Sequence, residues 1–241
     1  MTRHTLQGFA AIAAVGLWLA GAAPSQAATI VTNPGYAPGI GYEWGITMGA
    51  NDTAVFDSSQ HPNAPHNTGV GAKSWAEPAN PVGGKGWTHT SQWVALDLSG
   101  LTENTLLTVS HSRGTTGSLF PAFSLYQGWE QVGPETHQFN NIGNTSWAAN
   151  LTYIDHVANA GGPDGTANGV GTTSVSKTFN LAPGLYSIAL GGNPSFDLAQ
   201  TGRHAFAADL TTAPVPVPAA LWLFGSGIAA MAGLARRTFS A

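Results

Sequence analysis

The clearest pattern in the chain is a series of short segments in which apolar and polar residues alternate. Residues 92–98 read Gln-Trp-Val-Ala-Leu-Asp-Leu, and a period of two is typical of a β-strand. Segments of strand type also cover residues 105–111, 120–126, 174–181, 184–191 and 204–210. Ala182 and Pro183 separate two of these segments and predict a hairpin there. We therefore expect an all-β fold, a single antiparallel β-sandwich or jelly-roll-like domain.

Two regions depart from this pattern. Residues 29–86 are rich in Gly, Pro and Asn and predict an irregular N-terminal part with one or two strands. Residues 144–159 are the only segment in which a helix is plausible, because Trp147, Leu151, Ile154 and His156–Val157 fall near helical spacing. Asn144 or Thr145 would cap that helix.

The N-terminal end has the pattern of a leader for export. Residues 1–27 begin with Arg3 and His4, continue through an apolar stretch at 9–23, and end on the small residues Ser25 and Ala27. This order predicts a secretory signal peptide that is cleaved after Ala27. A membrane anchor is the alternative, but the apolar stretch is shorter than the roughly 20 residues that a span needs.

The C-terminal tail, residues 213–241, has three parts. Prolines at 214, 216 and 218 act as a stiff spacer, an uncharged apolar run covers residues 219–235, and two arginines follow. Such a run is at the lower edge of a spanning helix, and the arginines favour the cytoplasmic side. A Pro-containing motif, a hydrophobic helix and a basic end, at Val215, Pro216, Val217, Pro218, Arg236 and Arg237 in this chain, make up the PEP-CTERM sorting signal of Gram-negative bacteria, which this tail resembles.

This resemblance implies the route of the protein rather than its activity. It implies an exosortase-type sorting protease as partner, transient residence of the tail in the inner membrane, and a final place at the cell surface or outside the cell, associated with the outer membrane. Val217 stands where the family has Glu. The folded body is then expected at residues 28–212.

Composition narrows the class of the body. Its five cations face twelve acidic residues, so nucleic acid is not an expected partner. The chain has no cysteine, which excludes disulfides and thiolate metal sites. Across the whole chain, eight Trp and ten Phe argue against disorder. The sequence also lacks the Gly-x-Ser-x-Gly, His-Glu-x-x-His, Walker and EF-hand motifs, and we expect no catalytic residues and no enzyme.

Histidine is the residue type that stands out in the body, with seven copies. Without thiols, imidazole is the natural ligand for copper, zinc or nickel. In residues 86–90 an extended chain would place Trp87 and His89 on the same face. Copper at His89 would then lie within reach of Trp87, whose oxidised indole can open to kynurenine and offer a further nitrogen. The alternative is a packed tryptophan beside a solvated histidine.

A second resemblance rests on residues 86–91, 118–129, 136–141, 151–156 and 183–191 together. In this order they resemble the copper-repressible, copper-binding surface proteins of methane-oxidising bacteria. The resemblance implies one copper held by two histidines and by a kynurenine, with Trp87 as the kynurenine and His89 as the first ligand. For the second ligand we favour His137, in a polar loop after Trp129, while His111 and His156 remain open. The expected role is copper scavenging or homeostasis.

Two other interpretations stay open. Asp155, Asn159 and Asp164 lie in a Gly-rich segment and could bind calcium through oxygen ligands. Six tryptophans, at 44, 75, 87, 93, 129 and 147, would suit an adhesion module of a biofilm matrix if they stacked on exopolysaccharide. Most tryptophans are expected to fill the core instead, Trp93 above all, because it lies in an alternating strand.

Overall fold

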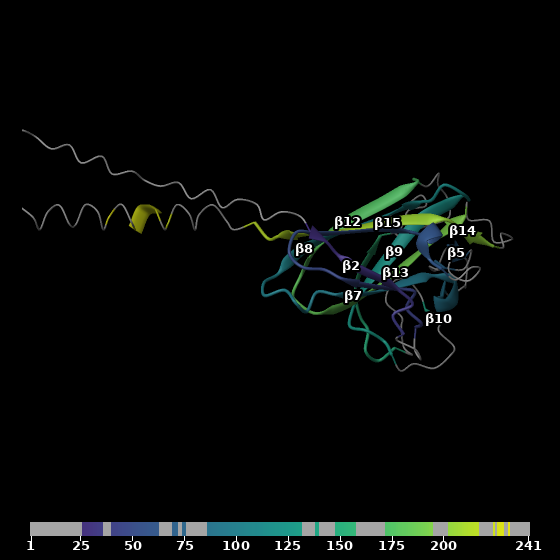
Figure 1. The fold of residues 1–241 in the computed structure, drawn as a ribbon, viewed down its shortest axis with the longest axis horizontal. Coiled ribbons are helices and arrows are strands. Elements are labelled where there is room, and N and C mark those ends of the chain that lie inside the picture. Colours follow the sequence, from purple (N-terminus) through teal and green to yellow (C-terminus); the bar gives the residue numbers. More distant parts are fainter. Residues whose placement is uncertain are drawn as a thin grey trace, which may run out of the picture.

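Two β-sheets face each other and enclose the main hydrophobic core (Figure 1). In this computed structural model the structure describes residues 26–35, 40–62, 69–71, 74–75, 86–131, 138–139, 148–157, 172–194 and 202–216, together with 224, 226–228 and 231. The expectation of an all-β, sandwich-like fold is confirmed.

The first sheet has five strands in the order β1-β4-β15-β8-β12. These strands are β1 (Gln26–Ala27), β4 (Asp52–Asp57), β15 (Phe206–Pro214), β8 (Thr105–Arg113) and β12 (Ser174–Leu181). All pairs are antiparallel except that of β1 with β4.

The second sheet has six strands in the order β11-β9-β13-β7-β3-β2. These strands are β11 (Thr152–Val157), β9 (Leu119–Gln127), β13 (Leu185–Pro194), β7 (Gln92–Asp97), β3 (Trp44–Thr47) and β2 (Thr29–Thr32). Only β3 and β7 pair in parallel. Two small ladders lie beside the sheets, β6 (Gly86–Trp87) with β10 (Gln138–Phe139) and β5 (Val70–Gly71) with β14 (Arg203–His204).

Alternation along the strands builds the core between the sheets. On β8, Leu107 and Val109 are fully buried, while Leu106, Thr108 and Ser110, which alternate with them, are half-exposed. Strand β7 is buried on both faces, because segments around Tyr42 and Leu151 cover the outer face of its sheet. Trp93 belongs to this second cluster and is fully buried, as expected from its strand.

The expected hairpin between residues 174–181 and 184–191 is wrong. Both segments are strands, but β12 pairs with β8 in one sheet and β13 pairs with β7 and β9 in the other. Residues 182–184 therefore carry the chain across the sandwich. The physical reason is burial, since Phe179 of β12 and Ile188 of β13 enter the same core from opposite sheets.

The expected helix at residues 144–159 is also wrong in its described part. Residues 152–157 form strand β11, and Leu151 precedes it in a turn. The rest of the predicted helix, including Trp147, lies outside the described residues. In the N-terminal part, where one or two strands were expected, the described residues contain β2, β3, β4 and β5. At the other end, β15 continues past Thr212 to Pro214, which pairs with Thr105.

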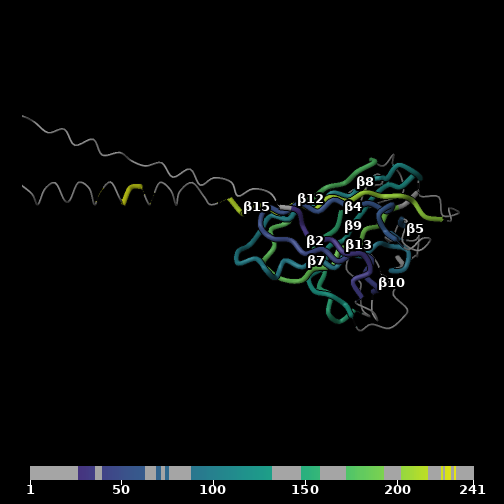
Figure 2. The backbone as a smooth tube through the Cα atoms, in the orientation of Figure 1, coloured from purple at the N-terminus to yellow at the C-terminus, as the bar shows by residue number. Residues whose placement is uncertain are grey.

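The sandwich has two ends, or poles, that matter for the site (Figure 2). We call one the tail pole, where β15 ends at Pro214 beside Ala50 and residues 101–105. The opposite one, the turn pole, holds the 3-10 turn η2 (Thr88–Thr90) and strand β14. Gln26 and Ala27 pair with the first residues of β4, so both ends of the described body lie toward the tail pole.

The tail itself is described at only a few positions beyond Pro216. Phe224, residues 226–228 and Met231 are helical and exposed. Among the described residues, no helix combines the length and the hydrophobicity that a membrane crossing requires. Val217, Pro218, Arg236 and Arg237 lie outside the described residues.

Candidate metal site at the turn pole

A short antiparallel ladder places Trp87 opposite Gln138. Strand β6 pairs with β10 so that Trp87 faces Gln138 and Gly86 faces Phe139. His137 directly precedes Gln138 in the sequence. His137 itself and the side chain of Trp87 lie outside the described part of the chain.

The chain does not stay extended after Trp87, as the argument for a shared face of Trp87 and His89 required. It turns at once into η2, in which the Ser91 amide donates to the Thr88 carbonyl at 3.2 Å. Thr88 is fully buried and His89 is exposed. The turn therefore buries Thr88 in the body and leaves His89 at the surface.

The Arg203 side chain stabilises this turn through hydrogen bonds to backbone carbonyls. Its Nη2 donates to the His89 carbonyl at 2.8 Å, and its Nη1 donates to the Gly69 carbonyl at 2.9 Å. Both bonds leave from one rigid guanidinium, so the two backbone segments are held at a fixed separation. The cation thus binds the backbone of the turn.

A buried carboxyl lies near this guanidinium. Glu43 is almost fully buried, and its Oε2 accepts a hydrogen bond from the Trp93 amide at 2.6 Å. Burial raises the pKa of Glu43 to about 8, although hydrogen bonds and the charge of Arg203 oppose the rise. Burial likewise lowers the pKa of Arg203, and the charge of Glu43 opposes that. Sequence reasoning missed both residues; their only signal is that charges are rare in this body.

The start of β7, which follows the turn, is fixed by buried side chains. Gln92 donates to the Gly69 carbonyl at 3.3 Å and accepts from the Trp44 indole at 3.0 Å. Ser91 donates to the Ser74 carbonyl at 3.2 Å. His89 consequently extends from a well-anchored segment.

His111, one of the open candidates for second ligand, lies inside the sandwich. It is fully buried, its Nε2 lies 2.9 Å from the Gly191 carbonyl, and its ring lies 5.6 Å from that of Phe206. Burial lowers its pKa to about 4, so the ring is neutral at pH 7. A residue in this position does not suit a metal site at the surface.

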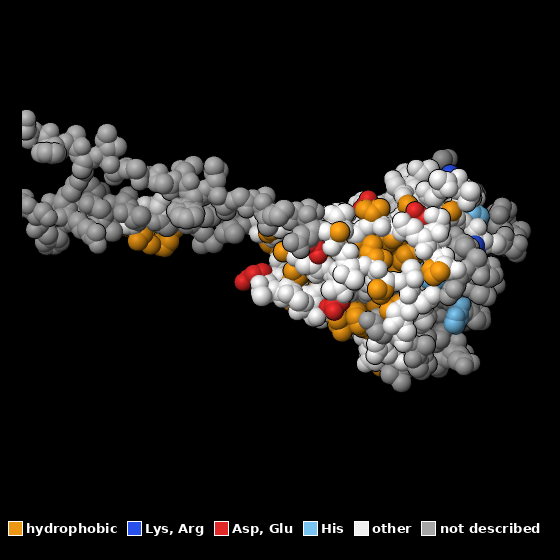
Figure 3. All heavy atoms as spheres, viewed as in Figure 1, with side chains coloured by type: hydrophobic (Ala, Val, Ile, Leu, Met, Phe, Trp, Pro, Cys, Tyr) orange, Lys and Arg blue, Asp and Glu red, His pale blue; other side chains and the backbone are white. Residues whose placement is uncertain are grey.

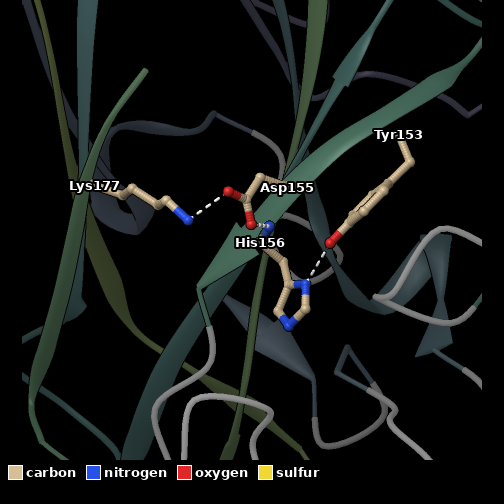
Figure 4. A network of polar contacts seen from close by, with 4 residues as sticks. All are labelled: Tyr153, Asp155, His156 and Lys177. Carbon is tan, nitrogen blue, oxygen red and sulfur yellow. Dashed lines mark hydrogen bonds and ion pairs between the residues drawn. The ribbon is translucent and has the colours of Figure 1, made fainter. Parts of the chain in front are cut away.

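His156, the other open candidate, belongs to a polar group on β11 (Figure 4). Its Nδ1 lies 2.6 Å from the Tyr153 hydroxyl. The Asp155 carboxylate accepts from the His156 amide at 2.7 Å and pairs with Lys177 at 2.5 Å. Burial alone would raise the pKa of Asp155, but the hydrogen bonds and charges of Lys177 and His156 together outweigh it, and the net pKa is lowered. Nothing here favours the calcium interpretation, and Asp164 lies outside the described residues.

The remaining functional expectations concern metal clusters and tryptophans. In the described ranges, no group of three His, Asp or Glu residues is placed to hold a metal ion. Of the tryptophan side chains described, those at 44, 75 and 93 are buried and that of Trp129 is half-buried. None of these four offers the exposed ring that stacking on a polysaccharide requires. Histidine side chains do appear at the surface of the end that carries β10 and β14 (Figure 3).

Comparison with known proteins adds a few solved structures. No protein-family model and no curated protein matches the sequence. The structure is similar to CorA, a surface-associated copper-binding protein important in copper acquisition by Methylomicrobium album BG8, with 16% identity, a TM-score of 0.47, and coverage of 71% of this chain and 98% of the other.

Two further structures show a weaker likeness. MopE, a secreted protein of Methylococcus capsulatus in which an oxidised tryptophan facilitates copper binding, has 14% identity, a TM-score of 0.39, and coverage of 61% and 83%. The K1 cleaved adhesin domain of Lys-gingipain from Porphyromonas gingivalis W83 has 11% identity, a TM-score of 0.25, and coverage of 79% and 99%. At these values the likeness assigns no role to any residue of this chain.

Proposed function

We propose that this chain is an exported, cell-surface protein that binds copper without catalysis and serves copper scavenging or homeostasis. In this proposal His89 and His137 hold the metal, and Trp87 contributes a third nitrogen after oxidation to kynurenine. The observation that carries it is the pairing of Trp87 with Gln138.

The pairing bears on the second ligand. Neighbouring strands lie about 4.8 Å apart, and consecutive Cα atoms about 3.8 Å apart. In the sequence, His137 directly precedes Gln138, the residue that pairs with Trp87. His89 follows Trp87 by two residues and is exposed. This supports His137 over the buried His111 and over His156, whose Nδ1 is engaged by Tyr153.

The donor set suits copper. The chain offers imidazole nitrogens and no thiol, and Cu(I) accepts sites with few ligands. A pair of histidines is enough for such a site, so a cluster of three acidic or histidine residues is not needed. When bound, copper supplies one-electron redox chemistry beside Trp87, while Arg203 holds the backbone of the turn that carries His89.

The place of action follows from the two ends of the sequence. The leader at residues 1–27 and the PEP-CTERM-like tail with its exosortase-type protease support export and processing. The body would act at the cell surface or outside the cell, which is where a copper scavenger meets its metal.

Metal analysis of the natively expressed protein tests the proposal. We expect about one copper per chain, its loss in His89→Ala and in His137→Ala, and its retention in the matched control His156→Ala. Peptide mass spectrometry should show an oxidised residue 87. The proposal fails if native protein carries neither copper nor modified Trp87. Binding to exopolysaccharide that is indifferent to chelators would favour the adhesion module instead.

A further inference from the structure

We propose that Tyr153 and His156 form a proton-coupled redox pair at the partly exposed end of a chain of aromatic rings, where the pair gives one electron to a diffusing oxyl radical. This site lies on β11 and does not depend on copper. It is carried by a strand irregularity, a short hydrogen bond and a series of ring contacts.

The irregularity brings the two side chains together. Residues three apart on a regular strand point to opposite faces of the sheet. On β11, however, Tyr153 pairs with Tyr126 while Asp155 pairs with Leu125, so Ile154 is an extra residue. Such a bulge re-aims the side chains that follow it. His156, which pairs with Ser124, is thereby brought to the face of Tyr153.

The same bulge turns Asp155 the other way. Asp155 shares the inner face with its partner Leu125, a core residue, and reaches Lys177 on the edge strand of the opposite sheet. Its second oxygen accepts from the His156 amide at 2.7 Å. The backbone of His156 is therefore fixed by a carboxylate that an ion pair holds in place (Figure 4).

The hydrogen bond between the two rings allows a balanced electron and proton transfer. The Tyr153 Oη and the His156 Nδ1 are 2.6 Å apart. The phenol ring gives one electron to the oxyl radical, which becomes an oxyanion. At the same time the Tyr153 O–H bond breaks and an N–H bond forms at His156 Nδ1, because a neutral imidazole is a base near pH 7. The products are a neutral tyrosyl radical and an imidazolium.

Ring contacts connect this pair to the buried interior. The rings of Trp93 and Tyr126 are stacked with centroids 5.7 Å apart, and Tyr126 lies 6.0 Å from Tyr153. Trp93 and Tyr126 are fully buried, whereas Tyr153 is half-exposed. An electron vacancy on either buried ring is thus one or two ring contacts from the pair.

The vacancy comes to rest at Tyr153 because of its proton acceptor. Burial raises the pKa of Tyr126 well above its ordinary value, and the group beside its hydroxyl is Ser124, which is no base. Tyr186 also differs from Tyr153 in its acceptor, since its hydroxyl donates to the Ala182 carbonyl, which is no base, at 2.7 Å. Among the described tyrosines, Tyr153 is the one whose hydroxyl bonds to an imidazole in the contacts above.

Photo-oxidation of the purified, chelator-treated protein tests this. Light and pentaamminechlorocobalt(III) convert tris(bipyridine)ruthenium(II) into a one-electron oxidant, and frozen samples are examined by electron paramagnetic resonance. We expect a tyrosyl radical that is lost in Tyr153→Phe and retained in the control Tyr186→Phe. His156→Phe should slow its formation and abolish the solvent deuterium isotope effect, a readout that a merely structural role would not change.

The wild-type protein gives a second measurement, which no folding defect can affect. A nitroso spin trap marks the radical site, and mass spectrometry locates the adduct among the five tyrosines of the chain. An adduct at Tyr153 supports the proposal. No tyrosyl radical at all, an adduct at another tyrosine, or an isotope effect that survives in His156→Phe overturns it. Because the samples contain no copper, none of these results depends on the proposed metal site.

Discussion

The buried carboxyl of Glu43 makes the stability of the protein depend on pH in a direction that can be worked out. Its ordinary pKa is 4.5, and burial raises it to about 8 in the folded protein. The folded state therefore holds a proton that the unfolded state has lost, and stability falls as pH rises through this window. The cost is about 1.4 kcal/mol for each pH unit, or about 5 kcal/mol once Glu43 is fully ionised.

The window from pH 6.5 to 8 isolates this effect. Below pH 6.5, the ordinary pKa of histidine, His111 makes stability rise with pH and so opposes the effect of Glu43, because its pKa in the folded protein is about 4. Above it, wild-type protein should lose about 2 kcal/mol of its free energy of unfolding by pH 8. Glu43→Gln keeps an oxygen for the Trp93 amide but has no proton to lose, so its stability should stay level.

Urea unfolding followed by tryptophan fluorescence measures both slopes across this pH range. Glu103→Gln is the matched control, since Glu103 is exposed, and it should keep the wild-type slope. The reasoning is refuted if Glu43→Gln loses stability with rising pH as steeply as the wild type.

Three further predictions follow from other positions. The free energy of unfolding of wild type relative to His111→Gln should fall by about 3 kcal/mol as pH drops from 6.5 to 4, measured by urea titration, and a constant difference would contradict it. Asp155→Asn should lower the free energy of unfolding by no more than about 1 kcal/mol in thermal unfolding, because its ion pair with Lys177 is partly exposed. A larger loss would contradict this and would mean that the ion pair holds the two sheets together at this edge. Gly128→Ala should lower the free energy of unfolding by more than the roughly 1–3 kcal/mol that a positive φ alone costs. The φ of Gly128 is +94°, and the new Cβ would in addition meet the Asn150 carbonyl oxygen. Gly100→Ala, with nothing near its Cβ, is the control, and equal melting temperatures would refute the argument.

Strands could be predicted from the sequence where one face is buried and the other solvated. Strand β8, with Leu107 and Val109 inward, shows this alternation plainly. The pairing of strands could not be predicted in the same way. The parallel pair of Trp44 with Val94 joins segments far apart in the chain, and no local pattern encodes it.

The false helix at residues 144–159 has a specific physical cause. Leu151, Ile154 and Val157 stand three residues apart, which is also what one face of a helix shows. In the structure Leu151 precedes β11, Ile154 is the extra residue of the bulge, and Val157 pairs with Phe123. Their spacing therefore comes from a turn and a bulged strand and only imitates helical periodicity.

The candidate metal site was predictable only in part. The sequence shows the tripeptide from Trp87 to His89, and it shows that histidines rather than cysteines must supply the ligands. The turn at Thr88 was not predicted, because its buried threonine and the support by Arg203 come from contacts distant in sequence. Glu43 was missed because a carboxyl in the interior cannot be told from a surface one by pattern alone.

The two ends of the body lie toward one pole, and this has a consequence for processing and display. His89 lies at the turn pole, just before β7, and Pro214 lies at the tail pole, where β15 ends. Strand β7 alone, six residues long, spans roughly 20 Å between the poles. A tether joined beyond Pro216 would thus hold the imidazole on the side that faces the medium. Pro214 is the last paired residue of β15, so cutting the chain after Pro216 leaves every described strand pair intact. Cleavage after Ala27 would instead remove β1 from its pairing with β4. Release of the tail would therefore disturb the described sheets less than release of the leader.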